Sequence, residues 1–134
     1  MYLIINKGIL PYFLAIVKKD KTIISFLKDK IDLLKNIAIF LKKNKIRAKE
    51  IKGIILFLNS LTFSETRKVL TILNVWGEFG NVLLSVVKKE EVKITSYDGL
   101  KNMVKKIFEK GKKTLKKRII LPKYSKEPNI TIKT

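Results

Sequence analysis

Apolar residues fall in three short runs in the first part of the chain, at residues 2–6, 12–18 and 22–27. Short polar turns separate these runs. Runs of this length joined by such turns are typical of antiparallel strands in a meander. The pattern therefore predicts three antiparallel strands before the first helix.

Two longer segments carry apolar residues at helical spacing. One helix is predicted from Asp29 to about residue 41, with Asp29 as the N-cap and Asp32 in a first turn that the helix dipole favours. Residues 62–65 (Thr-Phe-Ser-Glu) match a capping box and open a second helix, predicted over residues 62–79. Both apolar arcs span about 180° or more, wider than the ~100° needed to pack against one sheet. This width predicts a second apolar contact for each helix.

The remaining segments complete a mixed pattern. Residues 53–58 form a continuous apolar run, typical of a strand buried on both faces, and residues 81–87 form another. Since the helix at 62–79 lies between them, a parallel crossover is predicted. A third helix with a narrow apolar stripe is predicted at 96–112, and a last short strand at 118–121.

The order of these elements predicts one α/β domain of the ribonuclease-H-like type, with a mixed five-stranded sheet and flanking helices. Three antiparallel strands come first and parallel crossovers follow, which is also the order in each lobe of the actin-like ATPases. We expect residues 1–121 to form this single lobe, with a basic helix and segment at 97–118. Residues 122–134 are expected to form an extended tail. Many functions share this topology, so it leaves the function open.

The composition narrows the possible chemistry. The 134 residues include no His and no Cys. This excludes thiolate metal sites, disulfides, a cysteine nucleophile and histidine acid–base catalysis. The composition therefore favours a binding or scaffolding protein over an enzyme.

The net charge of +19 comes from 30 basic and 11 acidic residues. Lys supplies 27 of the basic residues, and the chain has 20 Ile but only 3 Ala, a bias that an AT-rich coding sequence would also produce. The distribution is more informative: residues 100–134 hold 12 basic and 2 acidic residues, whereas residues 1–99 hold 18 and 9. The C-terminal quarter is therefore the candidate anion-binding surface.

Targeting signals are weak in this sequence. The apolar run at residues 8–17 is interrupted by Pro11 and is shorter than the roughly 18–20 residues that a spanning helix needs. The start of the chain does not resemble a signal peptide. We expect a cytoplasmic protein with no membrane contact.

Three segments resemble a known family in order and spacing. Leu-Ile-Ile-Asn-Lys-Gly at residues 3–8 stands where that family has a strand ending in Asp-Thr-Ser. Asn-Ser-Leu-Thr-Phe-Ser-Glu-Thr-Arg at 59–67 stands where it has Gly-Pro-Gly-Ser-Phe-Thr-Gly-Leu-Arg, with Phe63 and Arg67 identical. Residues 121–131 resemble its closing Pro-x-Tyr-x-Arg-x-Pro segment. The chain thus resembles a minimal, single-lobe and degenerate member of the TsaB (YeaZ) family, which takes part in threonylcarbamoyladenosine biosynthesis on tRNA.

The resemblance implies a scaffold function. TsaB is a non-catalytic partner of the catalytic subunit TsaD, and the two pair through the helices of this lobe. A heterodimer with a TsaD-like subunit is implied, or a homodimer through the same helices when that subunit is absent. The wide apolar arcs agree with an exposed interface patch, unless the sheet and the tail cover these residues. The candidate interface residues are Leu33, Ile37, Phe40, Arg67, Leu70, Leu73 and Trp76.

Departures from the family pattern argue against ligand chemistry. Asn6 stands where active actin-like enzymes have an Asp that serves metal and phosphate. The three glycines of the second segment are Asn59, Leu61 and Glu65 here, which would obstruct or repel an anion. We therefore expect no nucleotide, no metal, no other cofactor and no catalytic residue.

Two other functions stay open. A stand-alone basic domain that binds RNA is the main alternative. In a tRNA-modifying complex the same basic segment would contact tRNA, with Lys112, Lys113, Lys116 and Lys117 as candidates. An enzyme in its own right, such as a kinase or a peptidase-like protein, is disfavoured by the missing His, Cys, loop glycines and first-strand Asp.

Overall fold

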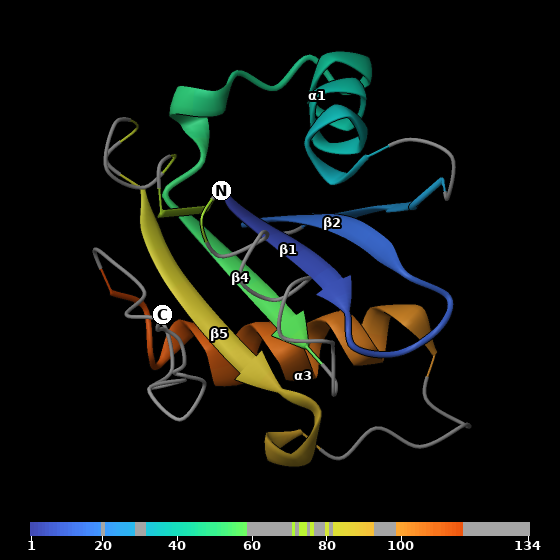
Figure 1. The fold of residues 1–134 in the computed structure, drawn as a ribbon, viewed down its shortest axis with the longest axis vertical. Coiled ribbons are helices and arrows are strands. Elements are labelled where there is room, and N and C mark those ends of the chain that lie inside the picture. Colours follow the sequence, from blue (N-terminus) through green and yellow to red (C-terminus); the bar gives the residue numbers. More distant parts are fainter. Residues whose placement is uncertain are drawn as a thin grey trace, which may run out of the picture.

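The computed structural model describes residues 1–19, 21–28, 32–58, 71, 73–74, 76, 80, 82–92 and 99–116. At its centre is a mixed five-stranded sheet with the order β3-β2-β1-β4-β5 (Figure 1). The strands are β1 (Tyr2–Lys7), β2 (Phe13–Lys18), β3 (Lys21–Phe26), β4 (Gly53–Leu58) and β5 (Leu83–Lys88). The β1–β2 and β2–β3 pairs are antiparallel, whereas the β1–β4 and β4–β5 pairs are parallel. This confirms the predicted antiparallel meander followed by parallel strands.

Burial increases toward the middle of the sheet. All six residues of β4 are buried, whereas no residue of the edge strand β3 is. The helix α1 (Leu33–Lys43) lies on one side of the sheet and α3 (Leu100–Lys112) on the other (Figure 1). Covering both faces explains why β4 is apolar throughout its length and does not alternate.

Two hydrophobic cores result, one on each face. The core on the α1 face consists of Leu3, Ile5, Leu14, Ile16, Ile37, Phe40, Leu41, Ile46, Ile51, Ile54, Leu56, Leu58, Leu73, Val82 and Leu84. The core on the α3 face consists of Ile4, Phe13, Ala15, Ile55, Phe57, Val87, Val92, Met103, Val104 and Ile107. Alternate residues of each central strand enter opposite cores, as the pleat of a strand requires.

The first helix begins later than predicted. Asp32 is its N-cap: the backbone of this residue is extended, and its Oδ1 accepts the N–H of Lys35 at 2.8 Å. The sequence prediction placed the cap at Asp29, which lies outside the described residues, and placed Asp32 within the first turn. The correction follows from the cap geometry, because an Asp that accepts this N–H lies just before the first helical residue.

The same helix ends in a Schellman motif. Ile46 donates its N–H to Leu41 O at 2.9 Å, and Lys45 donates to Lys42 O at 3.1 Å. Lys45 takes the left-handed conformation, with φ of 57°. This position usually holds glycine, because an L side chain is strained there.

The basic helix packs closely against the centre of the sheet. Met103, Val104, Ile107 and Gly111 are its buried residues. Gly111 allows the close approach, because a Cβ there would lie 2.9 Å from Cδ1 of Ile55. The predicted start of this helix at residue 96 lies outside the described residues, and Gly99 is the observed N-cap.

Several sequence predictions fall outside the described residues. Most of the predicted helix at 62–79 does, although Thr71, Leu73, Asn74, Trp76 and Gly80 have helical backbone. The predicted strand at 118–121 and the tail at 122–134 do as well. The domain boundaries therefore stay a prediction.

Candidate functional site

Asn6 lies near the end of β1, at the position where the family resemblance expects a functional acid. Its side chain is fully buried. Its Oδ1 accepts the N–H of Gly8 at 3.0 Å and of Ile9 at 3.1 Å, and its Nδ2 donates to the carbonyls of Ile9 at 2.9 Å and Pro11 at 3.3 Å. The carboxamide thus fixes the turn that joins β1 to β2.

This arrangement uses both polar atoms of Asn6 for structure. The oxygen already accepts two hydrogen bonds, and both amide hydrogens face carbonyl oxygens. A carboxylate could not replace the two donors. The other departures from the family pattern, at Asn59, Leu61 and Glu65, lie outside the described residues.

The structure corrects the predicted apolar patch on α1. Ile37 and Phe40 are 2% and 4% exposed, because both pack into the core between the helix and the sheet. Leu33 is half-buried and packs against the same core. The exposed large apolar residues of α1 are instead Leu34 and Ile39, at 52% and 44%.

The second half of the predicted interface gives a similar result. Leu73 is fully buried in the core on the α1 face, so the prediction that it is exposed is wrong. Trp76 is half-buried and packs against this core from its margin. Arg67 and Leu70 lie outside the described residues.

Asn36 holds α1 against the end of β3. Its Oδ1 accepts the N–H of Lys28 at 3.1 Å, and its Nδ2 donates to the carbonyl of Lys28 at 3.2 Å. The same Nδ2 also donates to Asp32 O at 3.0 Å. A buried amide in this position helps to set which side of the helix faces the sheet, and hydrophobic periodicity gives no signal for it because its partner is eight residues away.

The basic C-terminal part of the described chain carries three of the four lysines predicted to contact tRNA. Lys112, Lys113 and Lys116 are exposed, and Lys117 lies outside the described residues. Nζ of Lys112 lies 5.6 Å from the ring centre of Phe108. Glu109 lines a shallow surface depression together with Lys112 and Lys113, and so reduces the local positive charge.

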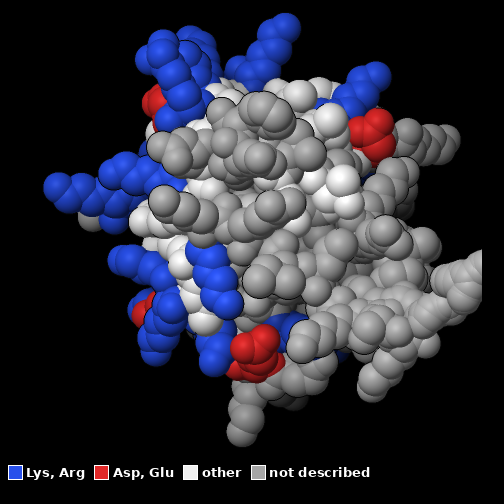
Figure 2. All heavy atoms as spheres, turned by 60° about the vertical axis from the view of Figure 1, so that its left-hand side comes forward, with Lys and Arg blue, Asp and Glu red and all other residues white. Residues whose placement is uncertain are grey.

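The charge pattern extends over a wider surface. Figure 2 shows one face of the molecule, on which most of the Lys and Arg side chains of the described residues lie along the left-hand side. The Asp and Glu side chains form small separate patches. Such an arrangement attracts polyanions without specifying a sequence, because lysine contacts a phosphate as a point charge.

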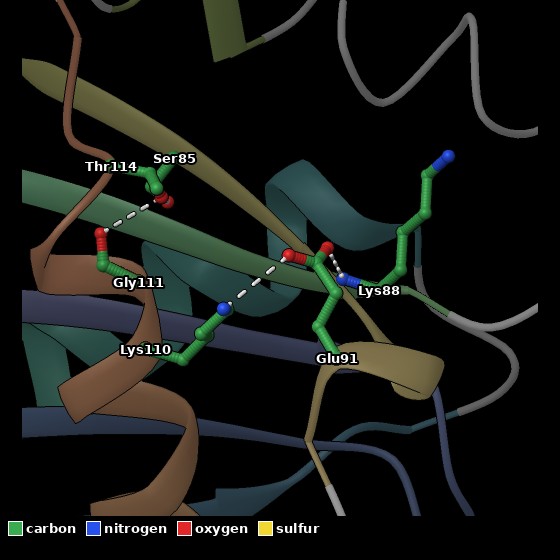
Figure 3. A network of polar contacts seen from close by, with 6 residues as sticks. All are labelled: Ser85, Lys88, Glu91, Lys110, Gly111 and Thr114. Carbon is green, nitrogen blue, oxygen red and sulfur yellow. Dashed lines mark hydrogen bonds and ion pairs between the residues drawn. The ribbon is translucent and has the colours of Figure 1, made fainter.

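A polar network fixes the end of α3 to β5 (Figure 3). The hydroxyls of Ser85 and Thr114 are 2.6 Å apart, and Thr114 Oγ1 donates to Gly111 O at 3.3 Å. Lys110 forms an ion pair with Glu91 at 3.9 Å. These contacts connect the end of α3 to β5 and to the residues that follow it.

Among the described residues, no group of three or more carboxylates is placed to hold a metal ion.

The strand order and pairing define a mixed α/β fold of the ribonuclease-H-like, actin-like-lobe class. No family model matches the sequence, and no curated protein matches it. Among solved structures, the chain is similar to YeaZ from Pseudomonas aeruginosa, with a TM-score of 0.55 and 10% identity over 65% of this chain and 43% of that chain.

An uncharacterised protein with similarity to peptidase YeaZ from Pseudomonas aeruginosa matches with a TM-score of 0.54 and 11% identity, over 65% of this chain and 42% of that one. The chain therefore spans less than half the length of either protein. At these identities the likeness shows a TsaB-like fold. Within the described residues, no helix is long and apolar enough to cross a membrane.

Proposed function

We propose that this protein is a non-catalytic scaffold subunit that binds and stabilises a TsaD-type catalytic subunit in tRNA threonylcarbamoyladenosine modification. The observation that carries the proposal is the combination of a YeaZ-like fold with a first-strand Asn6 whose carboxamide is fully used in its own turn. A fold of this class with no free polar group at that position favours a binding role over catalysis. The proposal includes no cofactor and a cytoplasmic location.

The proposed contact surface follows the exposed side of α1. Leu34 and Ile39 are its large exposed apolar residues. Ile37 and Phe40, on the opposite side of the same helix, are buried in the core, and Leu33 and Trp76 are half-buried and pack against that core. A few residues usually carry most of the binding energy of a protein interface, so single changes on this side of the helix can be informative. Arg67 and Leu70 remain candidates from the sequence alone.

Co-purification from the native host tests this proposal. We expect the tagged protein to retain a TsaD-type subunit. The double variant Leu34→Glu/Ile39→Glu should weaken that complex at least tenfold, about 1.4 kcal/mol or more, since two exposed anchors become charged. Leu10→Glu is the matched control, because Leu10 is 74% exposed but lies in the β1–β2 turn. Absence of a TsaD-type subunit, or equal loss with Leu10→Glu, would contradict the proposal.

The exposed lysines at the end of α3 favour a second candidate, a basic domain that binds RNA without a protein partner. Such binding weakens steeply with salt, because each phosphate contact releases counterions. Reversing the charge at Lys112, Lys113 and Lys116 should then lower both the affinity and its salt dependence. The same change at Lys35, Lys42 and Lys43, which are exposed on α1, controls for net charge.

Measuring RNA affinity at several salt concentrations, with and without a TsaD-type subunit, distinguishes the two candidate functions. RNA binding by the isolated protein that depends on Lys112, Lys113 and Lys116 supports the stand-alone domain. RNA binding seen only with a TsaD-type subunit supports a tRNA contact within the complex. Equal effects of the two triple reversals would assign the binding to net charge and contradict a specific lysine surface.

A further inference from the structure

The outer edge of β3 is the free edge of the sheet among the described residues. The N–H of Leu27 donates to Tyr12 O at 3.0 Å. The backbone N–H and C=O groups of the odd-numbered residues in this segment therefore point toward β2. Backbone groups alternate in direction along a strand, so those of Thr22, Ile24 and Phe26 face outward. No described residue forms a hydrogen bond with these outward groups.

The other edge of the sheet differs. On β5, the N–H of Lys116 bonds to Leu84 O at 2.7 Å, and an antiparallel bridge joins the two residues. Lys116 therefore covers part of that edge, and β3 has no corresponding cover within the described residues. An uncovered edge of this kind is a template for another strand.

Asn36 sets the length of the open segment. It accepts from the N–H of Lys28 and donates to the carbonyl of the same residue, as a residue of a neighbouring strand would. A strand added to β3 can therefore extend along Thr22 to Phe26 but not past Lys28. Residues 22–26, along which a further strand can pair, are centred on Ile24.

The side chains along this segment suit pairing. Residues 22–26 include no charged residue, and Phe26 is 51% exposed although it lies on the face of the sheet that packs against α3. Natural sheet edges are usually protected by charge, proline or a bulge. Here Lys21 is the one charged residue of the strand, at its first position.

We propose that β3 pairs with β3 of a second copy of this chain, antiparallel and about a two-fold axis at Ile24. In this register Thr22 lies opposite Phe26 of the second copy, and Ile24 lies opposite its own counterpart. Each pair exchanges two backbone hydrogen bonds, so the outward N–H and C=O groups of all three residues are satisfied in both copies. The two sheets become one continuous sheet.

The register also agrees with the side chains. Thr22, Ile24 and Phe26 share one face, so the exposed Phe26 ring packs beside the methyl group of Thr22 of the second copy. Lys21 lies opposite Leu27 of the second copy, so no lysine faces another across the pair. This surface differs from the α1 surface of the proposed function, and the inference does not depend on that function.

The dimer should be weak and favoured by salt. One pair of short strands buries less than the ~1,200 Å² typical of stable interfaces, so it should form at micromolar concentrations or above. Each copy carries a net charge of +19, and salt screens the resulting repulsion. Salt should thus strengthen this association while weakening any binding to RNA.

Sedimentation equilibrium of the isolated chain at roughly 10 to 500 µM tests the proposal. The mass should rise from 15.5 kDa toward twice that value, more so at about 0.5 M than at about 0.05 M salt. Phe26→Lys should weaken the dimer at least tenfold. Leu34→Lys is the matched control, because Leu34 has nearly the same exposure, 52%, and lies on α1.

A rescue experiment tests the register. Phe26→Glu should dissociate the dimer, and adding Thr22→Lys to the same chain should restore it, because each new carboxylate then lies opposite a new ammonium group. A protein that stays monomeric throughout the concentration range overturns the proposal. The proposal is also wrong if Leu34→Lys weakens the dimer as much as Phe26→Lys does. It is equally wrong if the double variant Phe26→Glu/Thr22→Lys does not recover association.

Discussion

Asn6→Asp should destabilise the protein, although the two side chains have almost the same shape. The native amide donates to two carbonyl oxygens and accepts from two N–H groups, all within the turn after β1. An ionised carboxylate keeps the two acceptor contacts and loses both donors. It also brings a negative oxygen toward the carbonyls of Ile9 and Pro11 in a site with no solvent exposure.

The magnitude follows from these contacts. Each lost hydrogen bond costs about 1 kcal/mol net, and leaving a buried carbonyl unsatisfied raises this toward about 2 kcal/mol. Two such losses give a decrease in the free energy of unfolding of about 2–4 kcal/mol. This is a large share of the roughly 5–15 kcal/mol that stabilises an ordinary domain.

Urea unfolding near about pH 7 measures this loss as a fall in the transition midpoint of roughly 1–2 M. Asn102→Asp is the matched control, because Asn102 is exposed on α3 and receives the same chemical change. We expect the control to lie within about 0.5 kcal/mol of the native protein. If Asn6→Asp is no more destabilising than Asn102→Asp, the structural role assigned to Asn6 is incorrect.

Three smaller effects can be measured alongside. Lys45→Gly should raise the free energy of unfolding by about 0.5–1 kcal/mol in thermal melts, since Lys45 has a φ of 57° at the end of α1. Gly111→Ala should lower it by about 1–2 kcal/mol, because overpacking against Ile55 exceeds the gain in helix propensity; unchanged stability would contradict the close packing. The backbone N–H of Arg47 is the main cause that lowers the pKa of Glu50 below 4.5, so Arg47→Ala should leave this pKa below 4.5 in an NMR titration. Because the pKa of Glu50 is lower in the folded protein, its contribution to stability should be present above about pH 4.5. This contribution should disappear as the pH falls through the folded-state pKa.

The strands could be predicted closely from the sequence. The third strand was expected at residues 22–27 and is observed at Lys21–Phe26, and β4 was predicted at its observed bounds. Short apolar runs with polar turns leave little freedom in where a strand begins and ends. The continuous apolar run at residues 53–58 also predicted a strand buried on both faces, and β4 lies inside the sheet with all six residues buried.

The orientation of α1 could not be predicted from the same pattern. Its apolar arc covers both Phe40, which is buried, and Leu34, which is exposed. An arc of about 180° fits several rotations of the helix against the sheet. The observed rotation depends on Asn36, whose amide bonds to Lys28, a contact between residues eight positions apart that hydrophobic periodicity does not reveal.

Asn6 and Asn36 show why the candidate site changed in character between sequence and structure. Each carboxamide donates and accepts at once, which neither a carboxylate nor a lysine can do, and each uses this to bind backbone groups of a nearby segment. The sequence indicated that Asn6 lacks the chemistry of an acid, and the geometry adds that the position has a structural task of its own. The two proposed partner surfaces lie elsewhere, on the outer side of α1 and along the edge of β3. These two surfaces present different groups, apolar side chains on the helix and unpaired backbone on the strand, so one chain could engage a different subunit and a second copy at the same time.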